Sequence, residues 1–194
     1  MARKHTHHTV PLRRKGEGRT NYRKRFSLLK SGKPRIYFKI GSKDAVAQVI
    51  LYDEKGDKVI LSARASDLRK QGWFFTNPNI PTCYLFGYYF AKLCEKNKIK
   101  QGIFDTGVVR PKHGGKHFAF AKGVVDGGLN MPVDEVAFPA EQRIKGEHIA
   151  NYTAGLKEKG ELSKRFSVFV EKAHNPQEIK DMFDKTLQKI DSLN

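Results

Sequence analysis

The segment at residues 34–40 alternates strictly between apolar and polar side chains. Successive side chains of an extended strand point to opposite faces, so this pattern predicts a half-buried strand with a basic outer face. A turn at 41–44 leads to a second, more apolar strand at 45–53, and a hairpin loop at 53–57 leads to a third strand at 58–65. Three consecutive strands with short connections predict an antiparallel meander. The apolar face consists of Ile36, Phe38 and Ile40, and the outer face consists of Arg35, Tyr37 and Lys39.

Apolar residues then recur at helical spacing. A helix is predicted from Thr82, acting as its N-cap, to about Asn97. A short buried strand at 102–109 follows, and a glycine-rich basic loop at 110–117 leads into a second helix. The order β-β-β-α-β-α predicts an α/β fold, a mixed sheet with helices packed on it. The stripe of the first helix is Leu85, Phe86, Tyr89, Phe90 and Leu93, and that of the second is Phe118, Ala121, Val125 and Leu129.

The remainder of the chain has a helical pattern. Short helices are predicted at 141–159 and 162–173, and a further helix begins at Asn175, with Pro176 at its first position and Glu178 placed to reach back to the cap. One-sided apolar faces here must dock on the body of the protein or on a partner. The predicted organisation is a basic extended arm at 1–31, a mixed-sheet core at 32–135 and a helical C-terminal extension at 136–194.

The charge of the chain is concentrated at its N-terminal end. The 194 residues contain 37 Lys and Arg against 20 Asp and Glu, a formal net charge of +17. Residues 1–43 hold 14 of these cations and one acid, which gives +13, so the other residues hold 23 cations and 19 acids and contribute only +4. A solvated surface needs charges of both signs, so this asymmetry indicates a polyanionic partner.

The densest cationic run lies at residues 13–26 and lacks the apolar periodicity of a buried element. Glycines let such a run follow an irregular surface, guanidinium groups match phosphate oxygens, and Tyr22 offers a face on which a base can stack. A nuclear-localisation tract or a solubilising tail is the plain alternative. The aromatic residues, and the ordinarily charged body that follows, favour an arm that grips nucleic acid.

Known catalytic and metal-binding motifs do not fit this sequence. The pair Gly115-Lys116 is followed by His117, so the phosphate-binding loop of nucleotide hydrolases fails to match, and neither Gly-x-Ser-x-Gly nor Cys-x-x-Cys occurs. An RNA-processing or RNA-modifying enzyme that uses Asp105 and His113 remains the alternative function, and a chromatin-type duplex DNA binder is a third. We expect a non-catalytic protein without cofactor or metal.

Cysteine usage and the N-terminus bear on the compartment. Cys83 and Cys94 lie eleven residues apart in one predicted helix, which is too far for a disulfide, so both are expected to be reduced packing residues. The sequence contains no apolar run of about 18 residues, as a membrane span requires, and begins without a segment of the signal-peptide type. A cytoplasmic location without membrane contact is expected.

Several pieces of the chain, in this order and spacing, resemble the large-subunit ribosomal protein family that is numbered eighteen in bacteria and archaea and five in eukaryotes. The pieces in the arm and body are residues 19–25 (RTNYRKR), 28–35 (LLKSGKPR), 47–49 (AQV), 72–73 (GW), 79–84 (NIPTCY) with Gly87, 104–107 (FDTG), and 118–129 (FAFAKGVVDGGL) followed by Pro132. Residues 138–139 and 143–150 with Tyr152 resemble the archaeal and eukaryotic form, and the chain length favours an archaeal protein. Departures from the family pattern are Ser42-Lys43, where Asn-Arg is frequent, and Phe86 in place of a small residue.

The resemblance implies a structural constituent of the large ribosomal subunit that binds 5S rRNA and anchors it in the central protuberance. It also implies contacts with large-subunit rRNA and with neighbouring large-subunit ribosomal proteins, and no small-molecule substrate. Together with the basic pattern it identifies candidate RNA-binding residues in the arm and in the body. The candidates are Arg13, Arg14, Lys15, Arg19, Asn21, Tyr22, Arg23, Lys24 and Arg25 in the arm, and Arg35, Lys39, Ser42, Lys43, Arg110, Lys112, His113, Lys116 and His117 in the body.

Overall fold

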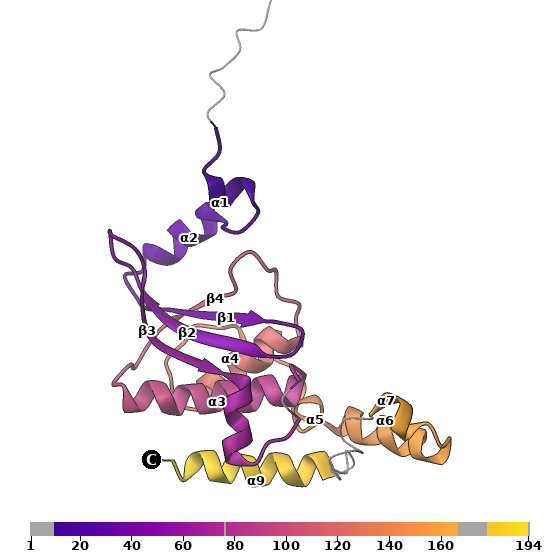
Figure 1. Cartoon of the computed structure of the whole chain (residues 1–194). Helices are drawn as coiled ribbons and strands as arrows, with labels where there is room; N and C mark the ends of the chain where they lie inside the picture. Colours follow the sequence, from indigo (N-terminus) through magenta and orange to yellow (C-terminus); the bar gives the residue numbers. More distant parts are fainter. Residues whose placement is uncertain (1–9, 76, 167–177, 194) are drawn as a thin grey trace, which may run out of the picture.

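A four-stranded mixed sheet lies at the centre of the computed structural model, which describes residues 10–75, 77–166 and 178–193 (Figure 1). The predicted meander is confirmed: β1 (Arg35–Ile40), β2 (Ala45–Leu51) and β3 (Lys58–Arg64) pair antiparallel in sequence order. The fourth strand, β4 (Ile103–Asp105), pairs in parallel with β1, so the strand order is β3-β2-β1-β4. β4 is shorter than predicted because the chain turns directly after it, where Val109 N–H donates to the Thr106 carbonyl.

Two helices cover one face of the sheet, α3 (Ile80–Lys96) and α4 (Lys116–Asp126) (Figure 1). The alternation in β1 places Ile36 and Phe38 in the core beneath them. α3 and α4 approach each other closely through two glycines: a Cβ atom added at Gly87 would lie 2.1 Å from the Phe120 carbonyl oxygen, and one added at Gly123 would lie 2.1 Å from that of Tyr84. The two helices therefore pack backbone against backbone.

The start of α3 differs from the prediction. Asn79, rather than Thr82, is the N-cap, and its Oδ1 accepts from the Thr82 N–H at 2.8 Å. The Thr82 hydroxyl is used elsewhere: it donates to the Phe75 carbonyl and accepts from Trp73 Nε1 at 2.9 Å. The helix begins earlier than predicted because Thr82 closes the preceding loop instead.

The predicted apolar stripe of α4 was only partly right. Ala121 and, beyond the helix, Leu129 are buried as predicted, but Val125 is 37% exposed and Phe118 is half-buried. The buried residues of the helix also include Phe120 and Val124, which were not predicted. Because Gly123 must face α3, the helix is rotated so that Phe120 and Val124 lie against α3 and the sheet. On α3, Leu85, Phe86 and Phe90 are buried as expected, and Tyr89 and Leu93 are half-buried.

The two cysteines are packing residues, as predicted. Both lie in α3 as buried free thiols. Burial raises the pKa of each thiol to about 12, so the neutral form is favoured at physiological pH.

The C-terminal part is helical, but it is divided more finely than predicted. The single helix expected at 141–159 is two, α5 (Glu141–Ile144) and α6 (Glu147–Glu158), because Gly146 between them has a left-handed φ of 80°. Short 3-10 helices occupy Ala65–Gln71 and Glu135–Ala137. α7 (Leu162–Arg165) begins the next predicted helix, whose later part lies outside the described residues, as does the expected cap at residues 175–176.

The last helix, α9 (Ile179–Asp191), docks on the body (Figure 1). Its apolar residues Ile179, Phe183 and Ile190 belong to the same core cluster as the sheet and α3. The Tyr88 hydroxyl of α3 donates to the Asp191 carboxylate at the far end of α9. Within the described ranges, no helix is both long and apolar enough to cross a membrane.

The N-terminal arm contains two helices that were not predicted, α1 (Arg13–Gly16) and α2 (Tyr22–Leu29). Asn21 is the N-cap of α2 and accepts from the Lys24 N–H at 3.1 Å. All residues of α2 are exposed or half-buried, so the helix does not join the core. It lies on the side of the sheet opposite α3 (Figure 1).

Candidate RNA-binding surface

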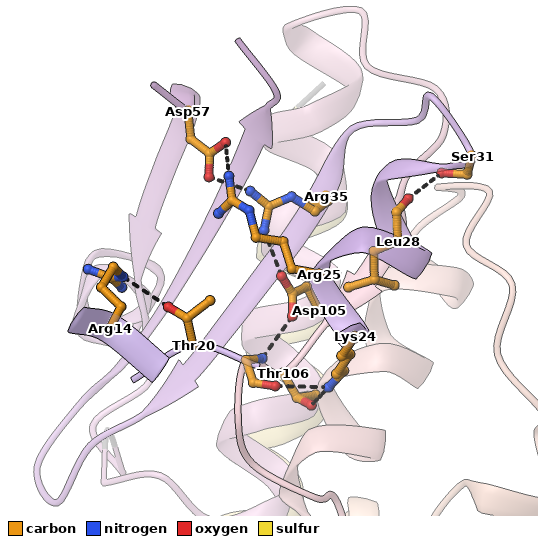
Figure 2. Close-up of polar contacts among 11 residues, drawn as sticks. Arg14, Thr20, Lys24, Arg25, Leu28, Ser31, Arg35, Asp57, Asp105 and Thr106 are labelled. Atoms are coloured by element: carbon orange, nitrogen blue, oxygen red, sulfur yellow. Dashed lines mark hydrogen bonds and ion pairs between the residues drawn. The ribbon is translucent and has the colours of Figure 1, made fainter. Parts of the chain in front are cut away.

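Lys24 ties the arm to the turn that follows β4. Its Nζ atom donates to the Thr106 hydroxyl at 2.7 Å and to the Gly107 carbonyl at 3.1 Å (Figure 2). Gly107 has a left-handed φ of 61°, and a Cβ atom there would lie 3.2 Å from the Tyr37 ring. The base of the arm, the turn at 106–109 and the outer face of β1 are therefore side by side.

A second tie is a chain of alternating charges. The Asp57 carboxylate accepts from Arg25 Nη2 at 2.7 Å and from Arg35 Nη2 at 2.5 Å (Figure 2). Arg35 Nη1 donates to Asp105 at 2.8 Å, and the other oxygen of Asp105 accepts from the Gly107 N–H at 2.8 Å. This chain joins α2 to β1, β4 and the loop before β3. These contacts hold the base of the arm in a fixed position on the sheet.

This network shows where three of the predicted site residues lie. Arg35 is only 4% exposed and is enclosed by its two carboxylate partners, Asp57 and Asp105. Lys24 and Arg25 are half-buried and hold the arm in place. Asp105 is 5% exposed and both its oxygens are occupied, a geometry that does not support the acid–base role of the enzyme alternative.

The other charged candidates of the arm face solvent. Arg14 Nε donates to the Thr20 hydroxyl at 2.9 Å. The Glu17 carboxylate lies 3.6 Å from Arg13 Nε and 3.2 Å from Arg19 Nε. Exposed ion pairs of this kind are weak, so a phosphate can replace them at little cost. The exposed candidates are Arg13, Arg14, Lys15, Arg19, Asn21 and Arg23, and Tyr22 is half-buried.

The body candidates are exposed at several places. The outer face of β1 carries Lys39, and the turn that follows it carries Ser42 and Lys43. The loop before α4 carries Arg110, Lys112 and His113, and α4 begins with Lys116; all four side chains are exposed. One end of this loop is fixed, because the Gly114 N–H donates to the Ala137 carbonyl at 2.9 Å.

His117, the second residue of α4, differs from these candidates because it is half-buried. Its ring stands edge-on to Phe38, with the ring centres 5.6 Å apart. Burial, and then the charges of Lys24 and Lys116, lower the pKa of His117 below its ordinary value of 6.5. His117 is therefore neutral at physiological pH and serves as a packing residue at the edge of the surface.

A cavity of about 490 Å³ opens between the arm and the turn after β4. The sequence analysis identified four of its lining residues but not Gly18, Thr20 or Val108. Val108 was missed because an apolar residue in a loop gives no sign of a binding role. The lining consists of Lys15, Gly18, Thr20, Asn21, Tyr22, Arg23 and Val108.

Other parts of the described structure are less suited to a polyanion. A larger cavity, about 690 Å³, lies at the C-terminal ends of α3 and α4, but its lining mixes cations such as Lys98 with the acids Glu95 and Asp126. Among the residues that the structure describes, no group of three or more His, Cys, Asp or Glu side chains is placed to hold a metal ion. The arm and the adjoining face of the sheet form the strongest candidate site.

Comparison with known proteins gives a consistent result. The family model described as "Ribosomal large subunit proteins 60S L5, and 50S L18" matches residues 6–103. The "Large ribosomal subunit protein uL18" of Thermofilum pendens is 42% identical over 184 residues, 94% of each chain. The proteins of the same name from Methanothermobacter thermautotrophicus and Korarchaeum cryptofilum are 38% and 36% identical, again over 94% or more of both chains.

Proposed function

The chain belongs to the family of ribosomal large-subunit proteins 60S L5 and 50S L18, and we propose that within the subunit it binds 5S rRNA through its arm and the adjoining face of the sheet. As a member of this family the protein is a structural, non-enzymatic constituent of the large ribosomal subunit, with rRNA and ribosomal proteins as its partners. The proposal concerns which RNA it holds, and with which residues.

The observation that carries the proposal is the division of the basic arm into two sets of cations. Lys24 and Arg25 are committed to the body through Thr106 and Asp57. The cations before them, from Arg13 to Arg23, remain exposed. Because the base of the arm is held on the body, the exposed cations before it form a preorganised row of charge. Such a row loses less entropy when it binds a phosphate backbone.

In the expected mechanism the arm supplies most of the affinity for RNA, and the body supplies the selectivity. Exposed arm cations displace counterions from phosphates, which supplies a salt-dependent and sequence-independent attraction. The exposed residues of the body, such as Lys39 and Lys43, then contact RNA only where its shape brings the backbone to them. Specific binding therefore requires that arm and body engage the same RNA.

The test is binding of the full chain to 5S rRNA, to tRNA and to duplex DNA of similar length, at low and at near-physiological salt. A preference for 5S rRNA that survives the higher salt supports the proposal. Equal binding to all three that disappears together as salt rises would overturn it, since only counterion release would then be at work.

A charge-matched pair of variants makes the test sharper. The arm variant replaces five exposed cations by Gln, and the control replaces five exposed cations that lie far from the arm. We expect the arm variant to lower the slope of log K against log salt by about 3.5–4.5, since each of the five lost phosphate contacts contributes roughly 0.7–0.9. The control should keep the slope, and an equal loss in both variants would contradict the assigned surface. The arm set is Arg13, Arg14, Lys15, Arg19 and Arg23, and the control set is Lys157, Lys159, Lys164, Arg165 and Lys185.

A further inference from the structure

We propose that the cavity between the arm and the turn after β4 receives one unpaired ribonucleotide, whose base stacks on Tyr22. The inference rests on the proposed function in one respect, since the nucleotide belongs to the rRNA that the protein binds. It goes beyond general attraction between cations and phosphates because it assigns a defined pocket to a single base. Its evidence lies in how the cavity is built and in what lines it.

The walls of the cavity come from distant parts of the chain and are held together by specific bonds. On one side, the contacts of Lys24 with Thr106 and Gly107 bring the turn that carries Val108 against the start of α2. On the other side, the N–H groups of Arg19 and Thr20 both donate to the Arg14 carbonyl, at 2.9 and 3.2 Å. The cavity is therefore a product of folding, and it would be absent if the arm were separated from the body.

The lining matches the parts of a nucleotide. Tyr22 is half-buried and Val108 is 50% exposed, so an aromatic and an apolar surface are both available to a base. Lys15 and Arg23 are exposed cations at the same opening and suit the flanking phosphates. The Asn21 amide nitrogen and the Thr20 hydroxyl can donate hydrogen bonds to the sugar or to a base edge, because both side chains use only their oxygen as an acceptor within the arm.

The volume of the cavity and the covered faces of paired bases favour an unpaired nucleotide. A volume of about 490 Å³ lies in the range of pockets that hold one small ligand. A base within a duplex is covered on both faces by its neighbours, so it can stack on Tyr22 only when it leaves the helix. Loops and bulges of a structured RNA supply such bases.

The experiment combines mapping with substitution in the full chain. A photo-crosslinking benzophenone amino acid at position 108 is activated in the complex with 5S rRNA and also in assembled large subunits, and the linked nucleotide is identified. In parallel, chemical probing at single-nucleotide resolution compares the wild type with Tyr22→Leu and Tyr22→Phe. Tyr152→Leu is the matched control, because Tyr152 is an exposed tyrosine on α6.

We expect one dominant crosslink to an unpaired nucleotide whose reactivity is altered by the wild type. Tyr22→Leu should weaken RNA binding about tenfold and restore the reactivity of that nucleotide, whereas Tyr22→Phe, which keeps the stacking face, should stay within about twofold. The control should match the wild type. Thermal unfolding checks that each variant is folded, and α2 lies outside the core.

The outcomes separate this inference from the proposed function. If the wild type prefers 5S rRNA but Tyr22→Leu changes neither affinity nor reactivity, the pocket is not a base site and the proposed function stands. A crosslink to paired nucleotides or to a neighbouring protein also overturns the inference. If 5S rRNA is not preferred, while in assembled subunits the crosslink falls on an unpaired nucleotide of the large rRNA, the inference stands and the proposed function fails.

Discussion

Arg35 and Asp105 form a buried ion pair across β1 and β4, with Arg35 Nη1 2.8 Å from the Asp105 carboxylate. The side chains of Arg35 and Asp105 are only 5% and 8% exposed. The same carboxylate accepts from the Gly107 N–H, and the same guanidinium reaches Asp57. The pair therefore links the parallel strands, the turn beside the cavity and the seat of the arm.

Removal of the Asp105 carboxylate should destabilise the fold. Asp105→Ala leaves the Arg35 charge buried with one partner, and a broken buried pair costs about 3–5 kcal/mol. We expect a loss of that size in the free energy of unfolding, measured by urea denaturation. Asp184→Ala is the control, because this carboxylate is exposed on α9 and should change stability by no more than about 0.5 kcal/mol. Similar small losses in both variants would show that the pair is not a structural link.

Arg25 should control how firmly the arm is seated. Arg25→Gln removes the charged contact to Asp57, a half-buried interaction worth about 1 kcal/mol. The amides of α2 should then exchange with deuterium roughly fivefold faster in the free protein. Arg23→Gln removes the same charge two residues away from an exposed position and should leave the exchange rates unchanged. Equal acceleration in both variants would mean that net charge, rather than the tie to Asp57, sets the order of the arm.

The elements predicted well are those whose signal is local. Strict alternation specified β1 and its buried face, because the periodicity of a strand is contained in a few consecutive residues. The helices of the arm were missed, because α2 lacks a buried face and depends on the Asn21 cap and on its ties to the body. The buried face of α4 was only partly predicted, because it is set by contact between Gly123 and α3, which periodicity within α4 does not reveal.

The same distinction holds for the candidate site. An arm of exposed cations could be predicted because charge asymmetry is visible along the chain. The role of Arg35 could not be predicted, because its partners Asp57 and Asp105 lie 22 and 70 residues away in the sequence. Val108 enters the cavity only through the contact of Lys24 with the neighbouring turn. Long-range pairing thus decides which basic residues remain free.

Gly87 should tolerate no larger residue. A Cβ atom at this position would lie 2.1 Å from the Phe120 carbonyl oxygen, so Gly87→Ala must force α3 and α4 apart. We expect a loss of at least about 3 kcal/mol in the free energy of unfolding, at the upper end of overpacking effects. Gly155→Ala is the control: it is also a helical glycine, but a Cβ atom there has open space. It should be neutral or gain up to about 1 kcal/mol from the better helix propensity of alanine. A Gly87→Ala protein as stable as this control would contradict the close packing of the two helices.

His117 should make the protein less stable as the pH falls. Its folded-state pKa is lowered by burial and by the charges of Lys24 and Lys116, so below about pH 6.5 the unfolded chain takes up a proton more readily than the folded one. Above that pH, His117 is neutral in both states and does not change the free energy of unfolding. The destabilisation that it causes is complete once the pH is below its folded-state pKa. We expect the free energy of unfolding of the wild type to fall more steeply between about pH 7 and pH 5 than that of His117→Gln, which cannot titrate.

The comparison between these two proteins separates the effect of His117 from that of His148, whose pKa is also lowered. Burial and Arg143 lower the pKa of His148, but His148 is present in both proteins and contributes equally to the two curves. Urea denaturation at several pH values, with constant ionic strength, gives the two profiles. Parallel profiles would show that the His117 ring is not held in a neutral environment. A steeper fall for the wild type would confirm that the ring packs against Phe38 as a neutral group and leaves phosphate contact to the exposed cations beside it.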